Sequence, residues 1–207
     1  QMIRAHMDFV KGKSDVLLKK IGVGMLLDEM AQFLEKDFKA HRIAIRTDAQ
    51  YKGNIRADET KIKRAFYNLA KNAKEAMPEG GTLSIAADEQ GAHVVFRFTD
   101  TGQGIPPEIR GKLFQSFVTF GKENGTGLGL AQVKSFADQH QGQIDVESQV
   151  GKGTTFTMKL PATVPDKNDE KAPMVDASSP GVSPAEAPAT LGHVLADENQ
   201  IQQVVMN

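Results

Sequence analysis

The sequence predicts an α+β fold: a two-layer α/β sandwich in which a mixed, mostly antiparallel sheet of about five strands is covered on one face by about three helices. Three segments carry apolar residues at helical spacing, and shorter segments that alternate apolar and polar residues lie between them. Two pairs of these shorter segments are joined by tight turns that contain glycine, as in hairpins of antiparallel strands.

The helices are predicted from their apolar period and from the residues at their ends. The first covers roughly residues 25–39, and the third covers residues 128–140. The second is the best defined, because Asp58 can cap its N-terminus and Pro78 ends it. Its apolar stripe consists of Ile62, Phe66, Leu69, Ala73 and Met77. Residues 14–20 are predicted to be the end of a further helix with a polar face.

The strands are predicted from their alternation of apolar and polar residues. They are RIAIR at 42–46, TLSIA at 82–86, HVVFRFTD at 93–100, QIDVES at 143–148 and TTFTMKL at 154–160. The second and third are joined at Gln90-Gly91, and the last two flank the GKG of residues 151–153, so both pairs are expected to form hairpins.

Composition excludes several classes of protein. The 207 residues contain no cysteine, which excludes disulfide scaffolds, cysteine-based metal sites and thiol nucleophiles. The net charge of -1, without a long basic block, predicts no nucleic-acid partner. No apolar run is long enough to cross a membrane, and the first residues do not form a signal peptide. Every Phe and Tyr precedes Thr157, and the proline-rich residues 162–190 are predicted to be a disordered linker.

Three segments carry residues that folding alone does not require. Asn68 and Asn72 are four apart, so they project from one side of the second helix. They are either solvated surface amides or oxygen ligands for a hard cation such as Mg²⁺. Asp100 ends a very apolar strand and precedes Gly102 and Gly104, so it either forms a turn or serves as a hydrogen-bond acceptor in a pocket.

The third segment, residues 125–130 (GTGLGL), opens the third helix. Its glycines allow backbone N–H groups to surround a phosphate at the positive end of the helix dipole, although a flexible loop with a capping glycine is the alternative. It is not a Walker A motif, because no Lys-Ser/Thr pair follows the glycines. Between the second and third segments, the apolar stretch of residues 113–122 is surrounded by Gly and Pro and fits a mobile lid, predicted over residues 105–125.

In order and spacing, these segments resemble the N, G1, F and G2 boxes of the GHKL (Bergerat) ATP-binding fold of sensor histidine kinases, DNA gyrase, Hsp90 and MutL. The resemblance spans residues 54–161 and rests on ADETKIKRAFYNLAKNAKEAM, DTGQGIP, LFQSFVTFGKENGTGLGLA and QGQIDVESQVGKGTTFTMKLP. The F box followed by GTGLGLA is most similar to the catalytic domain of bacterial sensor histidine kinases. The resemblance therefore implies ATP and Mg²⁺ as cofactors.

The resemblance also implies a role for each residue. Asn72 would be the Mg²⁺ ligand, Asp100 would accept from the adenine amino group, and Thr155 would support Asp100 from the neighbouring strand. Asn68, on the phosphate side, and Lys122, at the γ-phosphate, would be the catalytic residues. The complete nucleotide-binding set implied is Asn68, Asn72, Asp100, Gly102, Gly104, Ile105, Lys122, Gly125, Thr126, Gly127, Leu128, Gly129 and Thr155.

A sensor kinase also needs a phosphoacceptor histidine, which an acidic residue usually follows. None of the five histidines of this chain is followed by one. Residues 1–20 are therefore predicted to be the end of a dimerisation helix, and residues 21–161 the catalytic domain. The acceptor is expected upstream, on the dimerisation domain of a homodimeric kinase that also has a response regulator as partner. This part of the kinase is expected to be cytoplasmic, and membrane anchoring of the full-length parent stays open. Residues 191–207 resemble either the entry to another N box or the start of a receiver domain.

Two other functions stay open. One is a nucleotide-binding regulatory module such as an anti-sigma-type serine kinase. The other is a conformational ATPase of the gyrase or Hsp90 kind. That second family places a catalytic Glu one turn before the Mg²⁺ ligand, where this chain has Asn68, and this difference argues against efficient hydrolysis.

Overall fold

The computed structural model describes residues 17–118 and 127–162. The chain divides into two compact units, residues 1–163 and 164–207, and all described residues lie in the first. Residues 163–190 of the predicted linker and the segment after it, together with residues 1–16, therefore lie outside the described residues.

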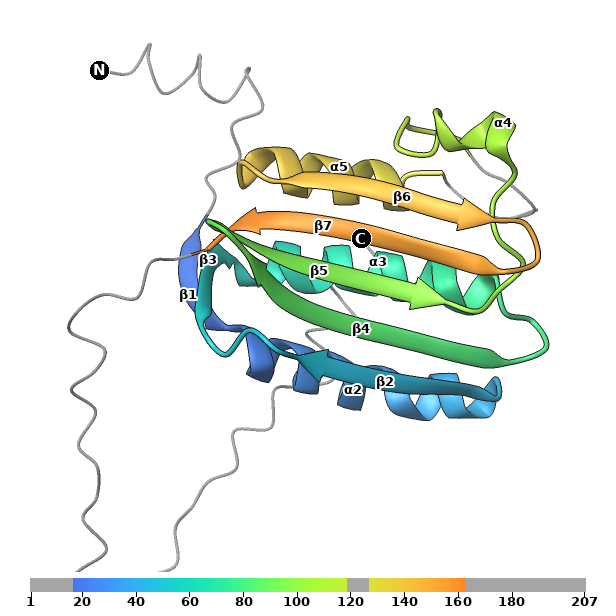
Figure 1. The fold of residues 1–207 in the computed structure, drawn as a ribbon, viewed down its shortest axis with the longest axis horizontal. Coiled ribbons are helices and arrows are strands. Elements are labelled where there is room, and N and C mark those ends of the chain that lie inside the picture. Colours follow the sequence, from blue (N-terminus) through green and yellow to red (C-terminus); the bar gives the residue numbers. More distant parts are fainter. Residues whose placement is uncertain (1–16, 119–126, 163–207) are drawn as a thin grey trace, which may run out of the picture. The chain divides into compact units, whose positions relative to one another are not determined.

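A five-stranded mixed sheet forms one layer of this unit (Figure 1). In spatial order its strands are β2 (Ile43–Ala49), β4 (Gly81–Gln90), β5 (His93–Asp100), β7 (Gly153–Pro161) and β6 (Gln143–Gln149). Only the β2–β4 pair is parallel, because a long connection that contains a helix joins those two strands, whereas the other three pairs are antiparallel. All five predicted strands and both predicted hairpins are thereby confirmed.

Three helices form the second layer and cover one face of the sheet (Figure 1). They are α2 (Val23–Ala40), α3 (Glu59–Glu75) and α5 (Gly129–Gln139). A one-turn helix, α4 (Pro107–Arg110), follows β5 and was not predicted. The two-layer α+β sandwich is therefore confirmed, and the face of the sheet opposite α2, α3 and α5 is called the open face below.

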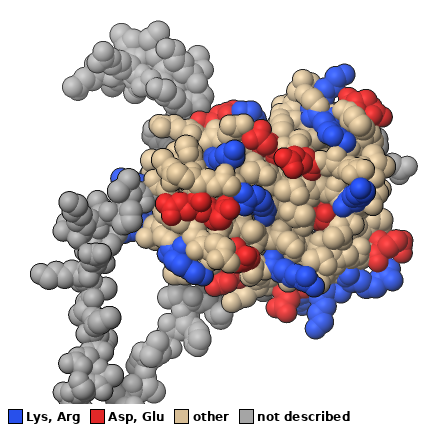
Figure 2. Space-filling view, in the orientation of Figure 1, with Lys and Arg blue, Asp and Glu red and all other residues tan. Residues whose placement is uncertain are grey.

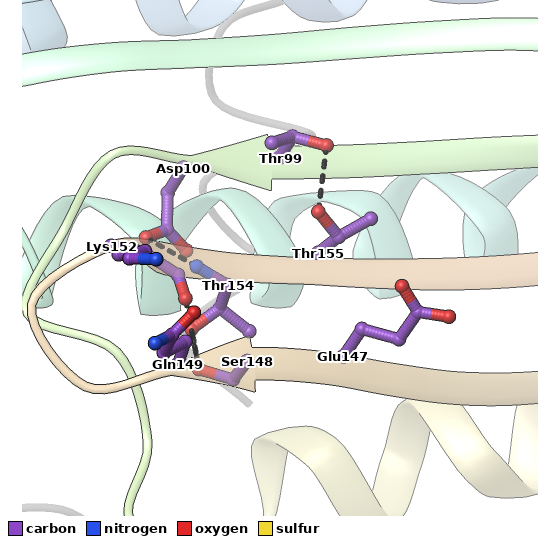
Figure 3. A pocket seen from close by; sticks show the side chains of 9 residues that line it. Thr99, Asp100, Glu147, Ser148, Gln149, Lys152, Thr154 and Thr155 are labelled. Carbon is purple, nitrogen blue, oxygen red and sulfur yellow. Dashed lines mark hydrogen bonds between the residues drawn. The ribbon is translucent and has the colours of Figure 1, made fainter.

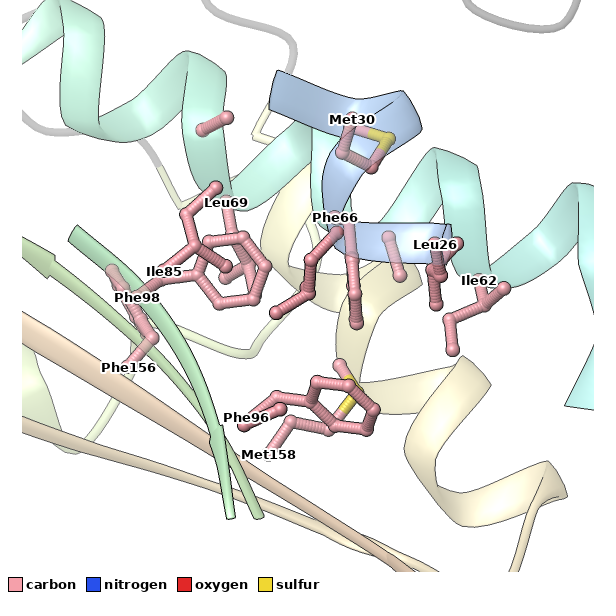
Figure 4. Close-up of a cluster of buried hydrophobic side chains, with 14 of the residues drawn as sticks. Leu26, Met30, Ile62, Phe66, Leu69, Ile85, Phe96, Phe98, Phe156 and Met158 are labelled. Carbon is pink, nitrogen blue, oxygen red and sulfur yellow. The ribbon is translucent and has the colours of Figure 1, made fainter. Parts of the chain in front are cut away.

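The apolar stripe of α3 holds the two layers together. Its N-terminus forms as predicted, because the Asp58 carboxylate accepts a hydrogen bond from Lys61 N at 3.1 Å. Phe66 is fully buried and packs edge-to-face against Phe96 and Phe98 of β5, with ring centroids 5.0 and 4.9 Å apart (Figure 4). This packing fixes the position of α3 over β5, which matters below because both elements carry candidate site residues.

One prediction about the N-terminal region is wrong. Residues 18–20 are not helical but belong to β1 (Leu18–Gly22), which pairs antiparallel with β3 (Asn54–Asp58) in a separate two-stranded sheet. Neither strand was predicted, because each is short and its partner lies more than thirty residues away in the chain. The folded unit thus includes residues 18–20, which lie before the predicted boundary at residue 21.

Candidate functional site

One side of α3 connects the two ends of the candidate site. Asn68, Asn72 and Ala76 follow one another at intervals of four, so they lie along the same side of the helix. Asn68 and Ala76 are eight residues apart, which corresponds to about 12 Å along the helix axis. Asn72, which is partly buried, lies in the middle of this line.

The start of α5 contacts the first position of this line. The Asn68 amide donates from Nδ2 to Gly129 O at 3.4 Å and to Gln132 Oε1 at 3.3 Å. The predicted helix amide and the glycine-rich segment, which are about sixty residues apart in the sequence, therefore meet in the structure.

The loop after β5 contacts the last position of the line. Gln103 N donates to Ala76 O at 3.0 Å. A Cβ added to Gly102 would lie 2.5 Å from Ala76 O, so this close approach requires glycine. The loop that carries the predicted G1 box is thus packed against the end of α3, one helical turn beyond Asn72.

Asp100 is the last residue of β5 and is buried, with 4% of its surface exposed. It lies on the same face of β5 as Phe96 and Phe98, which is the face toward the helices. Its Oδ1 accepts hydrogen bonds from Gly102 N at 2.8 Å and from Thr154 N at 3.2 Å. Among the described residues, none donates to Oδ2.

Burial raises the pKa of the Asp100 carboxyl above its ordinary value, and the hydrogen bonds from the two backbone amides act in the opposite direction. A carboxyl held in this way, with one oxygen satisfied by the backbone, leaves a single acceptor for a hydrogen-bond donor. It can distinguish a ligand that presents an amino group from one that presents a carbonyl.

The prediction that Thr155 supports Asp100 is wrong. In the β5–β7 register Asp100 lies opposite Thr154, whereas Thr155 lies opposite Thr99. The Thr155 hydroxyl lies 3.0 Å from the Thr99 hydroxyl on the open face, since successive side chains of a strand point to opposite faces (Figure 3). The supporting residue is Thr154, and the sequence could have identified it only if the register of the two strands had been known.

Gly104 makes a close contact within the protein itself, and its predicted role beside a ligand stays a prediction. Sequence reasoning attributed it to a backbone that passes close to a ligand. In the structure it has a φ of +73°, and an added Cβ would lie 2.2 Å from Gln149 O, at the end of β6. The packing of the protein itself therefore requires glycine here.

Ile105 begins the predicted lid. It is partly buried against the core, and its N–H donates to Ser148 Oγ at 2.8 Å. Sequence reasoning did not single out Ser148. Farther along, Phe117 N donates to Gly127 O at 2.9 Å, while the Phe117 side chain is 78% exposed.

The phosphate-binding segment is described only in part. Lys122, Gly125 and Thr126 lie outside the described residues. Leu128 is the N-cap residue of α5, and no side chain caps this helix. The first N–H groups of α5, which lie next to Gly127 and Gly129, therefore have no capping side chain. N–H groups of this kind are suited to bind an anion.

A hollow of about 300 Å³ lies beside Asp100 (Figure 3). It is lined by Thr99, Asp100, Glu147, Ser148, Gln149, Lys152, Gly153, Thr154 and Thr155. Neither Asn68 nor Asn72 lines it, and Thr99 and Thr155 place it toward the open face. The candidate site is therefore defined by the contacts along α3 on the helical side, and this hollow lies behind it.

Three further observations concern metal binding, surface charge and membrane spanning. In residues 17–118 and 127–162, no three His, Cys, Asp or Glu side chains are grouped so that they could bind a metal ion on their own. Figure 2 shows the open face of the sheet, where acidic and basic side chains of the described residues are interspersed with no large basic patch. Within the same part of the chain, no helix is both long and apolar enough to span a membrane.

Comparisons with known proteins agree with this geometry. The family described as histidine kinase-, DNA gyrase B-, and HSP90-like ATPase matches residues 57–164. Sporulation kinase A of Bacillus subtilis is 36% identical over 73% of this chain and 25% of its own length. Sensor histidine kinase ZraS of Escherichia coli is 35% identical over 74% of this chain and 33% of its own length.

Solved structures of histidine kinases share the fold. The nucleotide-free catalytic domain of histidine kinase ThkA superposes with a TM-score of 0.64 at 28% identity, over 70% of this chain and 95% of that one. Full-length ShkA in complex with AMPPNP gives a TM-score of 0.66 at 28% identity, over 72% of this chain and 32% of that one.

The chain therefore belongs to the family of histidine kinase-, DNA gyrase B- and HSP90-like ATPases. Within that family, it is a catalytic ATP-binding domain of the sensor histidine kinase type. It spans only a quarter to a third of the two curated relatives named above.

Proposed function

We propose that this domain binds ATP with Mg²⁺ and transfers the γ-phosphate to a histidine on the dimerisation domain of the same kinase. The observation that carries the proposal is the line of Asn68, Asn72 and Ala76 on α3. Its first member contacts the glycine-rich start of α5, and its last contacts the loop that follows Asp100. Groups suited to phosphate and to an amino-bearing base thus lie at opposite ends of one helix face.

At the base end, Asp100 is the residue that would recognise adenine. Its Oδ1 is engaged by Gly102 N and Thr154 N, so Oδ2 is left to accept a hydrogen bond from the adenine amino group. Guanine presents a carbonyl oxygen at the same ring position, and an ionised carboxylate repels it. Ile105 and the backbone of Gly104 follow immediately and would line the base.

At the phosphate end, the first N–H groups of α5 and the backbone of Gly127, Leu128 and Gly129 would bind phosphate oxygens. Asn68 holds this segment through Gly129 O, so it would position the phosphates as well as contact them. Lys122, Gly125 and Thr126 belong to the same proposal, and their roles stay predictions.

The donor set fits Mg²⁺. Mg²⁺ prefers hard oxygen ligands and usually keeps several waters, with only one or two protein ligands in addition to substrate phosphates. Asn72 offers one amide oxygen, and no cluster of three His, Cys, Asp or Glu accompanies it in the described part of the chain. When bound, the ion would neutralise phosphate charge as it develops during transfer.

The residues of this chain would contribute positioning. Phosphoryl transfer requires little covalent chemistry from the protein, so alignment of the phosphates by Asn68 and by backbone amides supplies most of what is needed. Asn68 carries an amide, which cannot act as a general base, and this disfavours the alternative of an ATPase that activates water.

The described histidines do not provide the acceptor. His140 is buried, with its Nε2 accepting from Asp58 N at 3.0 Å and its Nδ1 lying 2.8 Å from Phe136 O. His41 and His93 are exposed but are followed by Arg42 and Val94. We therefore propose an acceptor on a separate dimerisation domain of a homodimeric parent protein, a cytoplasmic location for this domain, and a response regulator as the next phosphoryl acceptor.

One experiment tests the transfer. The chain is incubated with ATP labelled at the γ-phosphate and Mg²⁺, together with a separately supplied dimerisation domain from a histidine kinase relative. Acid-labile, base-stable label on that domain supports histidine phosphorylation. Label on a serine of a partner instead would favour the regulatory serine kinase, and release of phosphate without labelled protein would favour the ATPase.

A further inference from the structure

Ser148, in β6, makes three hydrogen bonds through one hydroxyl. Ile105 N donates to Ser148 Oγ at 2.8 Å, the hydroxyl donates to Gly153 O at 2.9 Å, and Thr154 Oγ1 lies 2.9 Å away. A serine hydroxyl has one proton and two acceptor positions. Because its proton goes to Gly153, Thr154 must be the donor in the remaining bond. The hydrogen-bonding capacity of Ser148 is then completely used.

The end of β6 and the turn after it also contact the chain that leaves β5. Gly151 N donates to Gln103 O at 2.8 Å. Gly104 packs so closely against Gln149 O that no larger residue fits. The chain from Gln103 to Ile105 is therefore fixed at three consecutive residues to the end of β6 and the turn that follows it, and the Ser148 hydroxyl is the only side chain among these attachments.

The other end of the network reaches the carboxylate. Thr154, which donates its hydroxyl proton to Ser148, donates its backbone N–H to Asp100 Oδ1 at 3.2 Å. Figure 3 shows these side chains grouped at the ends of β5, β6 and β7. A continuous series of contacts therefore runs from Ile105 through Ser148 and Thr154 to Asp100, between groups that are all buried or partly buried.

We propose that Ser148 is a positioning residue of the nucleotide site, whose hydroxyl couples the orientation of the Asp100 carboxylate to the position of the segment that begins at Ile105. This inference rests on the proposed function and adds to it a residue that does not contact the nucleotide. A purine amino group that binds Asp100 restricts the motion of Thr154 and Ser148. Because the Ile105 amide donates to Ser148, the motion of that amide is restricted as well. Adenosine, which lacks phosphates, is therefore sufficient to order the start of this segment.

The test measures hydrogen exchange of the Ile105 amide and affinity for adenosine in the full 207-residue chain. In the wild type, saturating adenosine slows exchange of this amide. In Ser148→Ala the amide loses its acceptor and exchanges at least about tenfold faster, adenosine binds about fivefold more weakly, and saturating adenosine no longer slows exchange. Ser148→Thr, which keeps a hydroxyl, restores the response.

Ser84→Ala is the matched control. Ser84 lies in β4 on the open face, opposite Thr99 in the strand register, and removing its hydroxyl is the same chemical change. It leaves exchange at Ile105 and adenosine affinity at wild-type values. If Ser148→Ala does not fold, Thr154→Val decides, because it removes only the hydroxyl that donates to Ser148 and keeps the N–H that Asp100 accepts.

The results separate this inference from the proposed function. If the wild type binds neither ADP·Mg²⁺ nor adenosine, both are overturned. If the wild type binds and Ser148→Ala behaves like Ser84→Ala, the inference alone is overturned. It is also overturned if adenosine slows exchange of the Ile105 amide equally in wild type and Ser148→Ala, since the signal then does not pass through this hydroxyl.

Discussion

Replacing Asp100 by asparagine tests the base end of the site with almost no change in side-chain volume. The carbonyl oxygen of Asn can keep the two hydrogen bonds that Oδ1 accepts from Gly102 N and Thr154 N. The amide nitrogen then occupies the position of Oδ2. It presents a donor where the adenine amino group also presents one, so the variant loses its hydrogen bond and gains a repulsive contact.

The expected loss follows from the kind of hydrogen bond removed. A bond to a charged group contributes about 1.5–3 kcal/mol, which corresponds to a 10- to 150-fold change in Kd. Because two donors also face one another in the variant, we expect a loss at the upper end of this range. Calorimetric titration with ADP and Mg²⁺ measures it, and Asp145→Asn, which removes the same charge from an exposed position in β6, is the control.

Stability separates loss of binding from loss of fold. Burial raises the pKa of Asp100, so the folded state favours its neutral form. The contribution of this group to stability is present below its unfolded pKa and is lost as pH rises through the higher folded pKa. At neutral pH the charged side chain is therefore a cost, and Asp100→Asn should unfold at the same temperature as the wild type or higher. Unchanged ADP affinity in a folded Asp100→Asn would refute the assignment of the adenine site.

Three further changes test other parts of the structure. Asn72→Ala should abolish the gain in ADP affinity that Mg²⁺ produces, measured by titration with and without EDTA, whereas the exposed Lys71→Ala should keep it. Burial lowers the pKa of His140, against the opposing effect of its bond to Phe136 O, so its contribution to stability is present above the unfolded pKa and is lost as pH falls from about 6.5. His140→Ala should lower the free energy of unfolding by about 2 kcal/mol at pH 7 and weaken its dependence on pH between 7 and 5, as measured by urea titration. Gly104→Ala should lower the free energy of unfolding by more than about 2 kcal/mol. Gly24→Ala, in α2 with open space around it, should raise the free energy of unfolding by up to about 1 kcal/mol.

Each of these has an outcome that contradicts it. A Mg²⁺ effect that persists in Asn72→Ala would move the metal ligand elsewhere. Equal pH dependence in wild type and His140→Ala would show that other groups control acid unfolding. Wild-type stability of Gly104→Ala would mean that the turn between β6 and β7 can move away from the loop at little cost.

The sequence by itself determined the elements of the sheet and its helical cover. Apolar period and glycine turns are local properties, and they predicted five strands, two hairpins and three helices that the structure confirms. The cap at Asp58 was also predictable, because capping depends on residues within one turn of the helix. Local signals failed at β1 and β3, where each short strand is stabilised by a partner far away in the chain.

The candidate site divides in the same way. The residue types and the order of the boxes identified Asn68, Asn72 and Asp100 as candidates, since these depend only on spacing along the chain. The identity of the residue beside Asp100 did not follow from spacing. It depends on the β5–β7 register, in which a shift of one residue exchanges the helical side for the open face. The resemblance implied Thr155, whereas the register places Thr154 opposite Asp100.

Only the tertiary structure decided which groups meet. The Asn68 amide reaches Gly129, Gly102 packs on Ala76, and the Ser148 hydroxyl joins Ile105 to Thr154, in each case across at least 26 residues of sequence. The first two contacts form because the apolar stripe of α3 must be buried against β5, and that burial brings the polar side of the helix to the ends of the strands. The third forms because β7 pairs with both β5 and β6. Local sequence sets which side chains are available, and the packing of two layers sets which of them share a site.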